Sequence, residues 1–381
     1  MRILHTADWH VGRTIRGRGR SAEHEAVLAE ITAIAAAERV DLVLVAGDVF
    51  DTAAPSPDAE RVVYRALVEL AAVAPVVVVA GNHDSPQRLA AVQPLLAANR
   101  VTVAATLARP DSGGVVELTA GGAPVRLALL PFLSQRGIVR ADDLLALDAD
   151  QHAGQYAARS TAVIAALAEP FTPDAVNLVV AHLFVTGATV GGGERSAHTV
   201  FDYAVPGAAL PVSAHYVALG HLHRTQRVPA ACPAWYSGSP LQLDFGETAN
   251  ASAVLLVDAE PGTPVAVRTA PLTAGRRLRT LQGTLGQLEA LAGTTGTDHL
   301  RVLVESEARA GLAEQVREWF PDAVEVVTQA AEAARPIEVE RLGRSPAELF
   351  AEYLADRGAT DERVTALFAE LFDAASSADS A

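Results

Sequence analysis

Residues 1–12 read MRILHTADWHVG: an apolar run from Arg2 to Thr6 leads directly into Asp8 and His10. The same design recurs along the chain, where short apolar, β-branched runs typical of buried strands end in side chains that can bind metal ions. The later segments read VAGDVFD at residues 45–51, AGNHDS at 80–85, a histidine at 182, and ALGHLH at 218–223. We therefore expect the functional side chains to gather at strand ends.

The first hundred residues predict βαβ units. Strands are expected at Arg2–Thr6, 41–45 and Val76–Val79, and helices at 22–38, 57–72 and Pro86–Ala97. Such alternation makes a mostly parallel sheet, with functional sites at the carboxyl ends of its strands. The chain then becomes richer in strands, which we expect at 101–105, 115–118, 125–130, 176–181, 216–219, 253–257 and 265–269, with a helix near 155–168. We predict a mixed α/β fold of two packed β-sheets flanked by helices.

Three parts are expected along the 381 residues, because one ordinary core does not reach this size. Residues 1–272 form the main domain. Residues 273–337 form a small α/β domain, with strands at 300–304 and 324–327 and a helix over Leu312–Trp319. Residues 338–381 form C-terminal helices with apolar faces at helical spacing. These helices either pack back on the body or dock on a partner, and their two aromatic-rich faces favour a partner.

Composition narrows the possible environments. No apolar stretch approaches the roughly 18 residues of a membrane span, and the early first strand leaves no room for a signal peptide. The single cysteine, Cys232, fits a reducing cytoplasm and excludes an internal disulfide framework.

The net charge of −15 argues at face value against a polyanionic substrate, although a groove can be locally positive. The arginines beside the first segment form either a solvated flexible loop or a phosphate-contacting loop, which would bind DNA if the substrate is a nucleic acid: Arg13, Arg16, Arg18 and Arg20.

Seven side chains have the chemistry of a two-metal site, in which two divalent ions lie side by side and activate water to cleave a phosphate ester. The predicted metal ligands are Asp8, His10, Asp48, Asn82, His182, His221 and His223. Asp48 is the natural bridge, since one carboxylate can bind both ions. A lone D-x-H or H-x-H is more often structural, but the ordered set after strands favours metal.

Two neighbouring residues are candidates for catalysis without being needed as ligands. His83 lies beside Asn82 and can protonate the leaving group. Asp51, three residues after the predicted bridge, is a candidate to orient the His83 imidazole.

The motifs D-x-H, G-D-x-x-D, G-N-H-D, a lone His and G-H-x-H resemble the pattern of the calcineurin-like metallophosphoesterase superfamily. The D-W-H form, the segment YSGSP at 236–240 and the terminal helices are similar to its DNA-repair nuclease branch. The resemblance implies two Mn²⁺ ions, with Mg²⁺ as an alternative. It gives one ion Asp8, His10, Asp48 and His223, and the other Asp48, Asn82, His182 and His221. His83 takes the catalytic histidine position, whereas relatives outside the bacteria often carry His where Asp51 stands.

The resemblance also implies partners. Residues 273–337 would be the capping domain, and the C-terminal helices would bind the base of a coiled-coil ATPase subunit. Helices near 59–70 and 88–96 would form a homodimer within a heterotetramer, in a nucleoid-associated cytoplasmic complex.

We therefore expect a manganese-dependent nuclease that degrades double-stranded ends 3′ to 5′ and cuts single strands or hairpins, with DNA as substrate and no membrane partner. The first alternative is a small-molecule phosphodiesterase or phosphatase with the same metal site. The second is a non-catalytic scaffold that uses metal only to stiffen an adaptor for an ATPase.

Overall fold

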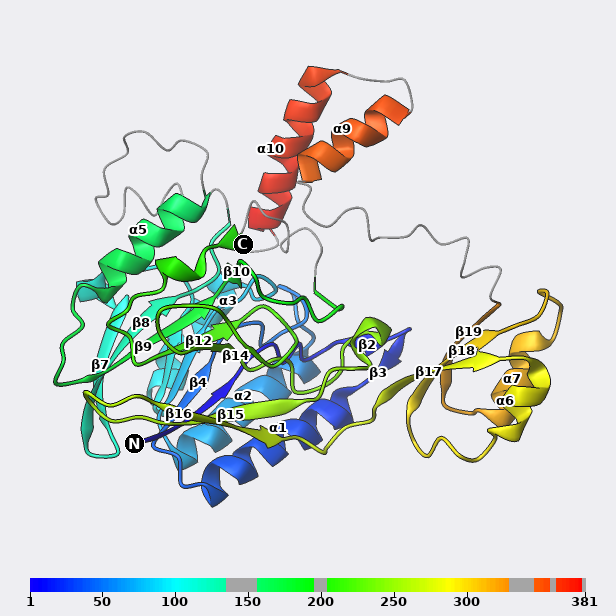
Figure 1. Cartoon of the computed structure of the whole chain (residues 1–381), viewed down its shortest axis with the longest axis horizontal. Coiled ribbons are helices and arrows are strands. Elements are labelled where there is room, and N and C mark those ends of the chain that lie inside the picture. The colour runs from blue at the N-terminus through cyan, green and yellow to red at the C-terminus, as the bar shows by residue number, and fades with distance from the viewer. Residues whose placement is uncertain (135–155, 195–203, 329–345, 357–360, 379–381) are drawn as a thin grey trace.

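Two six-stranded sheets form the centre of the computed structural model, which describes residues 1–134, 156–194, 204–328, 346–356 and 361–378 (Figure 1). The first sheet has the order β16-β15-β1-β4-β5-β6 and the second β13-β14-β12-β9-β8-β7. The first contains β1 (Arg2–Thr6), β4 (Leu42–Val45), β5 (Val76–Val79), β6 (Val101–Ala104), β15 (Ala253–Asp258) and β16 (Ala266–Pro271). The second contains β7 (Val115–Ala120), β8 (Ala123–Leu130), β9 (Val176–His182), β12 (Tyr216–Gly220), β13 (Gln226–Arg227) and β14 (Ala234–Tyr236).

Helices cover the outer face of each sheet, which confirms the predicted layers. The first sheet packs against α1 (Ser21–Ala37), α2 (Pro57–Val73) and α3 (Pro86–Ala97), and the second against α5 (Tyr156–Ala168). Between the sheets, Leu44 and Val77 of the first share a buried cluster with Leu178 and Tyr216 of the second. Burial of both faces explains why the strands read as continuous apolar runs.

Strand direction places the functional segments at one edge. Strands β1, β4, β5 and β6 are parallel, and so are β8, β9, β12 and β14. The polar segments after β1, β4 and β5 therefore meet at the carboxyl edge of the first sheet, and those after β9 and β12 at that of the second. This arrangement allows residues far apart in sequence to share one site.

A separate three-stranded parallel sheet follows residue 273. It contains β17 (Leu278–Gly283), β18 (His299–Val304) and β19 (Ala323–Thr328), with α6 (Leu285–Ala290) and α7 (Leu312–Trp319), and has its own apolar cluster. The sequence analysis missed β17 and α6, because β17 is mostly polar and alternates weakly. The boundary near 273 remains a prediction, and the boundary at 337–338 lies outside the described residues.

The remaining elements are short or terminal. Two short strand pairs join β2 (Thr14–Ile15) to β3 (Arg18–Gly19) and β10 (Phe184–Val185) to β11 (Ala204–Val205), and 3₁₀ turns are η1 (Pro110–Ser112), η4 (Gly207–Ala209) and η5 (Phe245–Glu247). Helices α9 (Pro346–Asp356) and α10 (Glu362–Ala378) pack against each other, with Phe350 and Phe368 stacked at 4.0 Å between ring centroids. Among the described residues, no helix is both long and apolar enough to cross a bilayer.

Candidate metal centre

The seven predicted ligands converge between the carboxyl edges of the two large sheets. They follow β1, β4, β5 and β12, or, for His182, end β9. Each is at most 5% exposed. Buried charged groups of this density need compensation by hydrogen bonds, opposite charge or metal.

The main chain adopts costly conformations to aim these side chains. Only seven non-glycine residues in the described ranges have positive φ, and four of them are predicted ligands: Asp8 (53°), His10 (47°), Asp48 (51°) and His221 (106°). Such conformations cost of order 1–3 kcal/mol each and concentrate at functional sites. The packing of the two sheets must therefore offset the cost of the backbone conformations that orient the predicted ligands.

One group of donor atoms surrounds His182. Its Nδ1 lies 2.8 Å from the Ala46 carbonyl oxygen and donates a hydrogen bond to it, so Nε2 is the ring nitrogen that is left to bind a proton or a metal ion. This Nε2 lies 2.9 Å from Asn82 Oδ1, 3.3 Å from His221 Nδ1 and 3.4 Å from Asp48 Oδ2. Several lone-pair atoms facing one another require a cation among them, either a proton or a metal ion.

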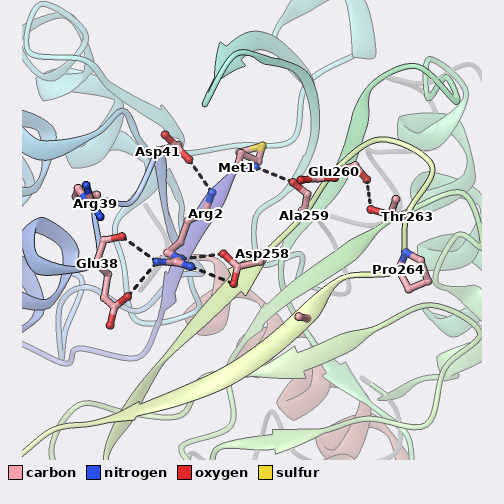
Figure 2. A pocket seen from close by; sticks show the side chains of 11 residues that line it. Met1, Arg2, Glu38, Arg39, Asp41, Asp258, Ala259, Glu260, Thr263 and Pro264 are labelled. Carbon is pink, nitrogen blue, oxygen red and sulfur yellow. Dashed lines mark hydrogen bonds and ion pairs between the residues drawn. The ribbon is translucent and has the colours of Figure 1, made fainter.

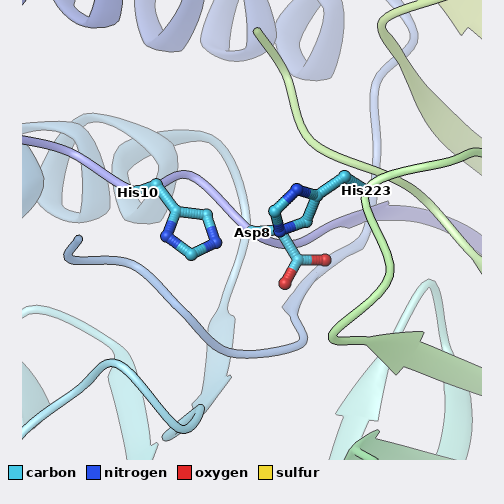
Figure 3. Close-up of side chains that lie close together, drawn as sticks. All are labelled: Asp8, His10 and His223. Carbon is cyan, nitrogen blue, oxygen red and sulfur yellow. The ribbon is translucent and has the colours of Figure 1, made fainter. Parts of the chain in front are cut away.

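A second group faces it across Asp48. Figure 3 shows Asp8, His10 and His223 directed toward a common space, and their ligand atoms lie within 4.8 Å of one another. His10 is buried, yet neither ring nitrogen makes a hydrogen bond of ordinary geometry within the described ranges. Its Nε2 lies 3.6 Å from Asp48 Oδ2, and its Nδ1 3.5 Å from Asp51 Oδ1. Buried ring nitrogens in this state are suited to binding a metal ion.

Asp48 lies between the two groups. Its Oδ2 is 3.6 Å from His10 and 3.4 Å from His182, while its Oδ1 accepts the His83 main-chain N–H at 2.7 Å. Gly81 makes this approach possible, because a Cβ there would lie 2.1 Å from Asp48 Oδ1. The position fits the bridging role predicted from the sequence.

The pKa values of the buried acids and histidines at this site differ from their ordinary values. Burial raises the pKa of Asp8 to about 7. Burial opposes ionisation of Asp48 as well, but the charges of His182 and His83 outweigh it and hold the pKa of Asp48 well below its ordinary value. Burial likewise lowers the pKa of His182, but Asp48 outweighs that effect and raises it to about 9.

The donor set fits two divalent ions. Four imidazoles with carboxylate and amide oxygens are a mixed set suited to borderline first-row metals, whereas Mg²⁺ prefers oxygen ligands alone. Ligand atoms about 2.1 Å from one ion stand about 3 Å apart when they subtend a right angle. The contacts of 2.9–3.6 Å around His182 and Asp48 are close to this spacing.

His83 lies beside the predicted ligands, with its ring centroid 4.6 Å from that of His10. Its Nδ1 lies 2.7 Å from the main-chain carbonyl oxygen of Asp51. Asp51 was expected to orient His83, and the atom in contact is this carbonyl oxygen. The Asp51 carboxylate lies 3.3 Å from Arg13 and 3.5 Å from His10.

Three acidic residues that the sequence analysis did not select support the ligands. Asp84 is buried and accepts main-chain N–H groups from Val49, Phe50 and Gly81, which ties the segments after β4 and β5 together. Glu247 and Glu194 contact His223. The sequence offers only a weak signal for them, namely an acidic residue directly after Gly193 and another after Gly246.

The four arginines after His10 differ in environment. Arg20 is buried and pairs with Glu23, while Arg16 pairs with Glu325 of β19 and Arg18 pairs with Asp322, directly before β19. Arg13 is partly exposed and pairs with Asp51 beside the site. Contact with DNA remains a prediction for all four, and Arg13 is the one nearest the proposed chemistry.

A surface pocket elsewhere does not coincide with this site. Figure 2 shows Met1, Arg2, Glu38, Asp41 and Asp258 around it. Arg2 is the first residue of β1, so the pocket lies at the strand end opposite to Asp8. Glu38 and Asp258 pair with the Arg2 side chain and Asp41 accepts its main-chain N–H, which gives these carboxylates a structural explanation.

The fold and the ligand set define a class, the metal-dependent phosphoesterases. The model of the calcineurin-like phosphoesterase family matches residues 1–224. The D subunit of the SbcCD nuclease from Bacillus subtilis is 36% identical over 284 residues, 73% of this chain and 71% of that protein. Its counterparts from Rhodobacter capsulatus and Escherichia coli are 38% and 31% identical, over 69% and 76% of this chain and 67% and 73% of theirs. The chain belongs to the calcineurin-like phosphoesterase family and, within it, to the SbcD group.

Proposed function

We propose that this chain is the nuclease subunit of an SbcCD-type complex and hydrolyses DNA phosphodiesters with two divalent ions. The observation that carries the proposal is the convergence of six buried side chains around a seventh, Asp48, in a chain similar to the D subunits of SbcCD nucleases. The predicted activities are 3′-to-5′ exonuclease on double-stranded ends and endonuclease on single strands and hairpins. Mn²⁺ is the proposed metal because the resemblance to the DNA-repair nuclease branch implies it, and the four imidazoles disfavour Mg²⁺, which prefers oxygen ligands.

Each ion has a proposed set of ligands. Asp8, His10, Asp48 and His223 would hold the first ion, and Asp48, Asn82, His182 and His221 the second. When bound, such a pair neutralises charge on the phosphate and activates water for in-line attack.

The proton for the leaving oxygen is assigned to His83. Contact with the Asp51 carbonyl fixes Nδ1 as a protonated nitrogen, so the proton exchanged with the leaving oxygen would travel through Nε2. The main-chain N–H of His83 also binds Asp48 Oδ1. The proposed acid is thus held to the proposed bridge, which fixes its position relative to the reacting phosphate.

Two surfaces are proposed for protein partners. Helices α9 and α10 expose Tyr353 (48%), Leu367 (53%) and Leu371 (58%), an apolar face suited to the coiled-coil base of an SbcC-type ATPase. Helices α2 and α3 expose Val68 (39%) and Leu95 (71%), where a second copy of the chain would dock to form the homodimer within the heterotetramer. In this proposal the complex acts on DNA in the cytoplasm, at the nucleoid.

The test is cleavage of linear and hairpin DNA by the full chain with Mn²⁺, with and without its ATPase partner. We expect cleavage that stops with EDTA and returns with Mn²⁺. Hydrolysis of small phosphoesters without DNA binding or cleavage in any combination would overturn the nuclease assignment. The absence of all hydrolysis, with metal bound, would favour a scaffold.

A further inference from the structure

Two glutamates, the buried Glu247 and the partly buried Glu194, hold the proposed ligand His223 at its ring and at its main chain. Glu247 Oε1 lies 2.6 Å from the His223 ring at Nδ1, and Glu194 Oε1 accepts the His223 main-chain N–H at 2.9 Å. Glu247 is completely buried. With Nδ1 engaged by a carboxylate, Nε2 is the ring nitrogen that remains for a metal ion.

Both carboxylates are themselves anchored. Glu247 Oε2 accepts the Leu243 N–H at 2.7 Å. Glu194 accepts the N–H groups of Gly191, Gly192 and Gly193 at 2.6, 2.8 and 3.1 Å. Each glutamate therefore has a fixed orientation before any ion arrives, which reduces the cost of organising the ligand.

Glycines allow the two supporting loops to meet. A Cβ on Gly193 would lie 1.9 Å from Glu247 Oε1, and a Cβ on Gly192 would lie 2.8 Å from the Gly246 carbonyl oxygen. Gly192 also has a φ of +109°, which other residues rarely adopt. The glycine-rich segment 191–193 is thus explained by packing behind His223.

The two groups of predicted ligands differ in what orients their histidine rings. The ring of His182 is oriented by a neutral carbonyl oxygen of Ala46, whereas that of His223 is oriented by a charged carboxylate. A carboxylate makes the opposite imidazole nitrogen a stronger ligand and fixes its tautomer.

We propose that Glu247, supported by Glu194, is a positioning residue that sets the affinity of the first ion separately from the second. It acts through His223 and does not itself contact the ions. The inference rests on the metal centre of the proposed function. Loss of such an indirect partner typically weakens metal binding by about 10–100-fold.

The test compares Glu247→Gln with a matched control, Glu23→Gln, in the full chain. Glu23 is also a carboxylate in a hydrogen-bond network, with Arg20 and His299, but it does not contact a proposed ligand. Mn²⁺ binding is followed by calorimetry and by electron paramagnetic resonance, which distinguishes a magnetically coupled pair of ions from a single ion. Thermal unfolding without metal reports folding of each variant.

We expect the parent chain and Glu23→Gln to bind two coupled ions. Glu247→Gln should bind its first-site ion about 10–100-fold more weakly and show a single-ion signal at intermediate Mn²⁺. Unchanged affinities in Glu247→Gln, or equal weakening of both ions, would overturn the inference. If Glu247→Gln does not fold, Glu194→Gln decides the question, with a smaller loss confined to the first ion expected. A parent chain that binds no ion would instead contradict the proposed function.

Discussion

Replacing Asp8 by asparagine should stabilise the metal-free protein while it destroys the first metal site. The Asp8 carboxylate is buried and accepts the His221 main-chain N–H at 2.9 and 3.1 Å. Burial raises the pKa of Asp8 from 3.8 to about 7, even with the opposing charges of His182 and His223. An asparagine oxygen can still accept the His221 N–H without carrying a charge.

The size of the destabilisation by the Asp8 carboxylate follows from the difference between its pKa in the folded chain and its pKa in the unfolded chain. Because the folded pKa is raised, the folded state loses stability relative to the unfolded state as pH increases from about 4 to above 7. A change from 3.8 to about 7, at about 1.4 kcal/mol for each pKa unit, gives a ceiling of about 4 kcal/mol. This destabilisation becomes small near pH 4 and disappears below it, where the carboxyl is protonated in the unfolded chain as well as in the folded one.

The assay is urea unfolding of the EDTA-treated parent chain and Asp8→Asn between pH 4 and 8. We expect Asp8→Asn to be more stable at pH 8, by up to about 4 kcal/mol, and the difference to shrink toward pH 4. Added Mn²⁺ should stabilise the parent more than the variant, because only the parent retains both sites. A metal-free variant that is less stable at pH 8, or a difference independent of pH, would refute the reasoning.

Three further predictions follow from the same contacts. His83→Ala should keep two Mn²⁺ ions and lose about 10²–10⁴-fold in DNA cleavage; full cleavage with both ions bound would exclude His83 as the acid. Asp51→Asn should reduce DNA cleavage far less than His83→Ala does, because the Asp51 carbonyl oxygen that contacts His83 remains. Equal losses of cleavage would show that the Asp51 carboxylate takes part in the reaction. The pKa values of His182 and His223 are raised to about 9 by Asp48 and Glu247, although burial opposes the rise. Both rings therefore hold protons in the metal-free protein at pH 7, and Mn²⁺ affinity should increase from about pH 6.5 toward 9 with proton release in calorimetry; pH-independent affinity would contradict this.

The sequence predicted the layers of the fold because each buried strand is a short apolar run. The bounds of the strands Arg2–Thr6 and Val76–Val79 and of the helix Pro86–Ala97 agree with the structure, and this helix begins after the N-cap Ser85. Strand ends also identified the ligand candidates, since parallel strands bring their carboxyl ends together.

What the sequence could not supply was long-range pairing. Glu247 contacts a histidine 24 positions earlier, and Arg18 pairs with Asp322, 304 positions away. A sequence pattern also does not show whether a residue makes its contact through its side chain or through its main chain. Asp51 was selected for its carboxylate, whereas its carbonyl oxygen contacts His83.

The central claim is tested most directly by anomalous diffraction from crystals of the full chain grown with Mn²⁺. The account predicts two manganese peaks on either side of Asp48, one bounded by Asp8, His10 and His223 and the other by Asn82, His182 and His221. A map without peaks at these side chains, or with ions bound only elsewhere on the surface, would contradict it.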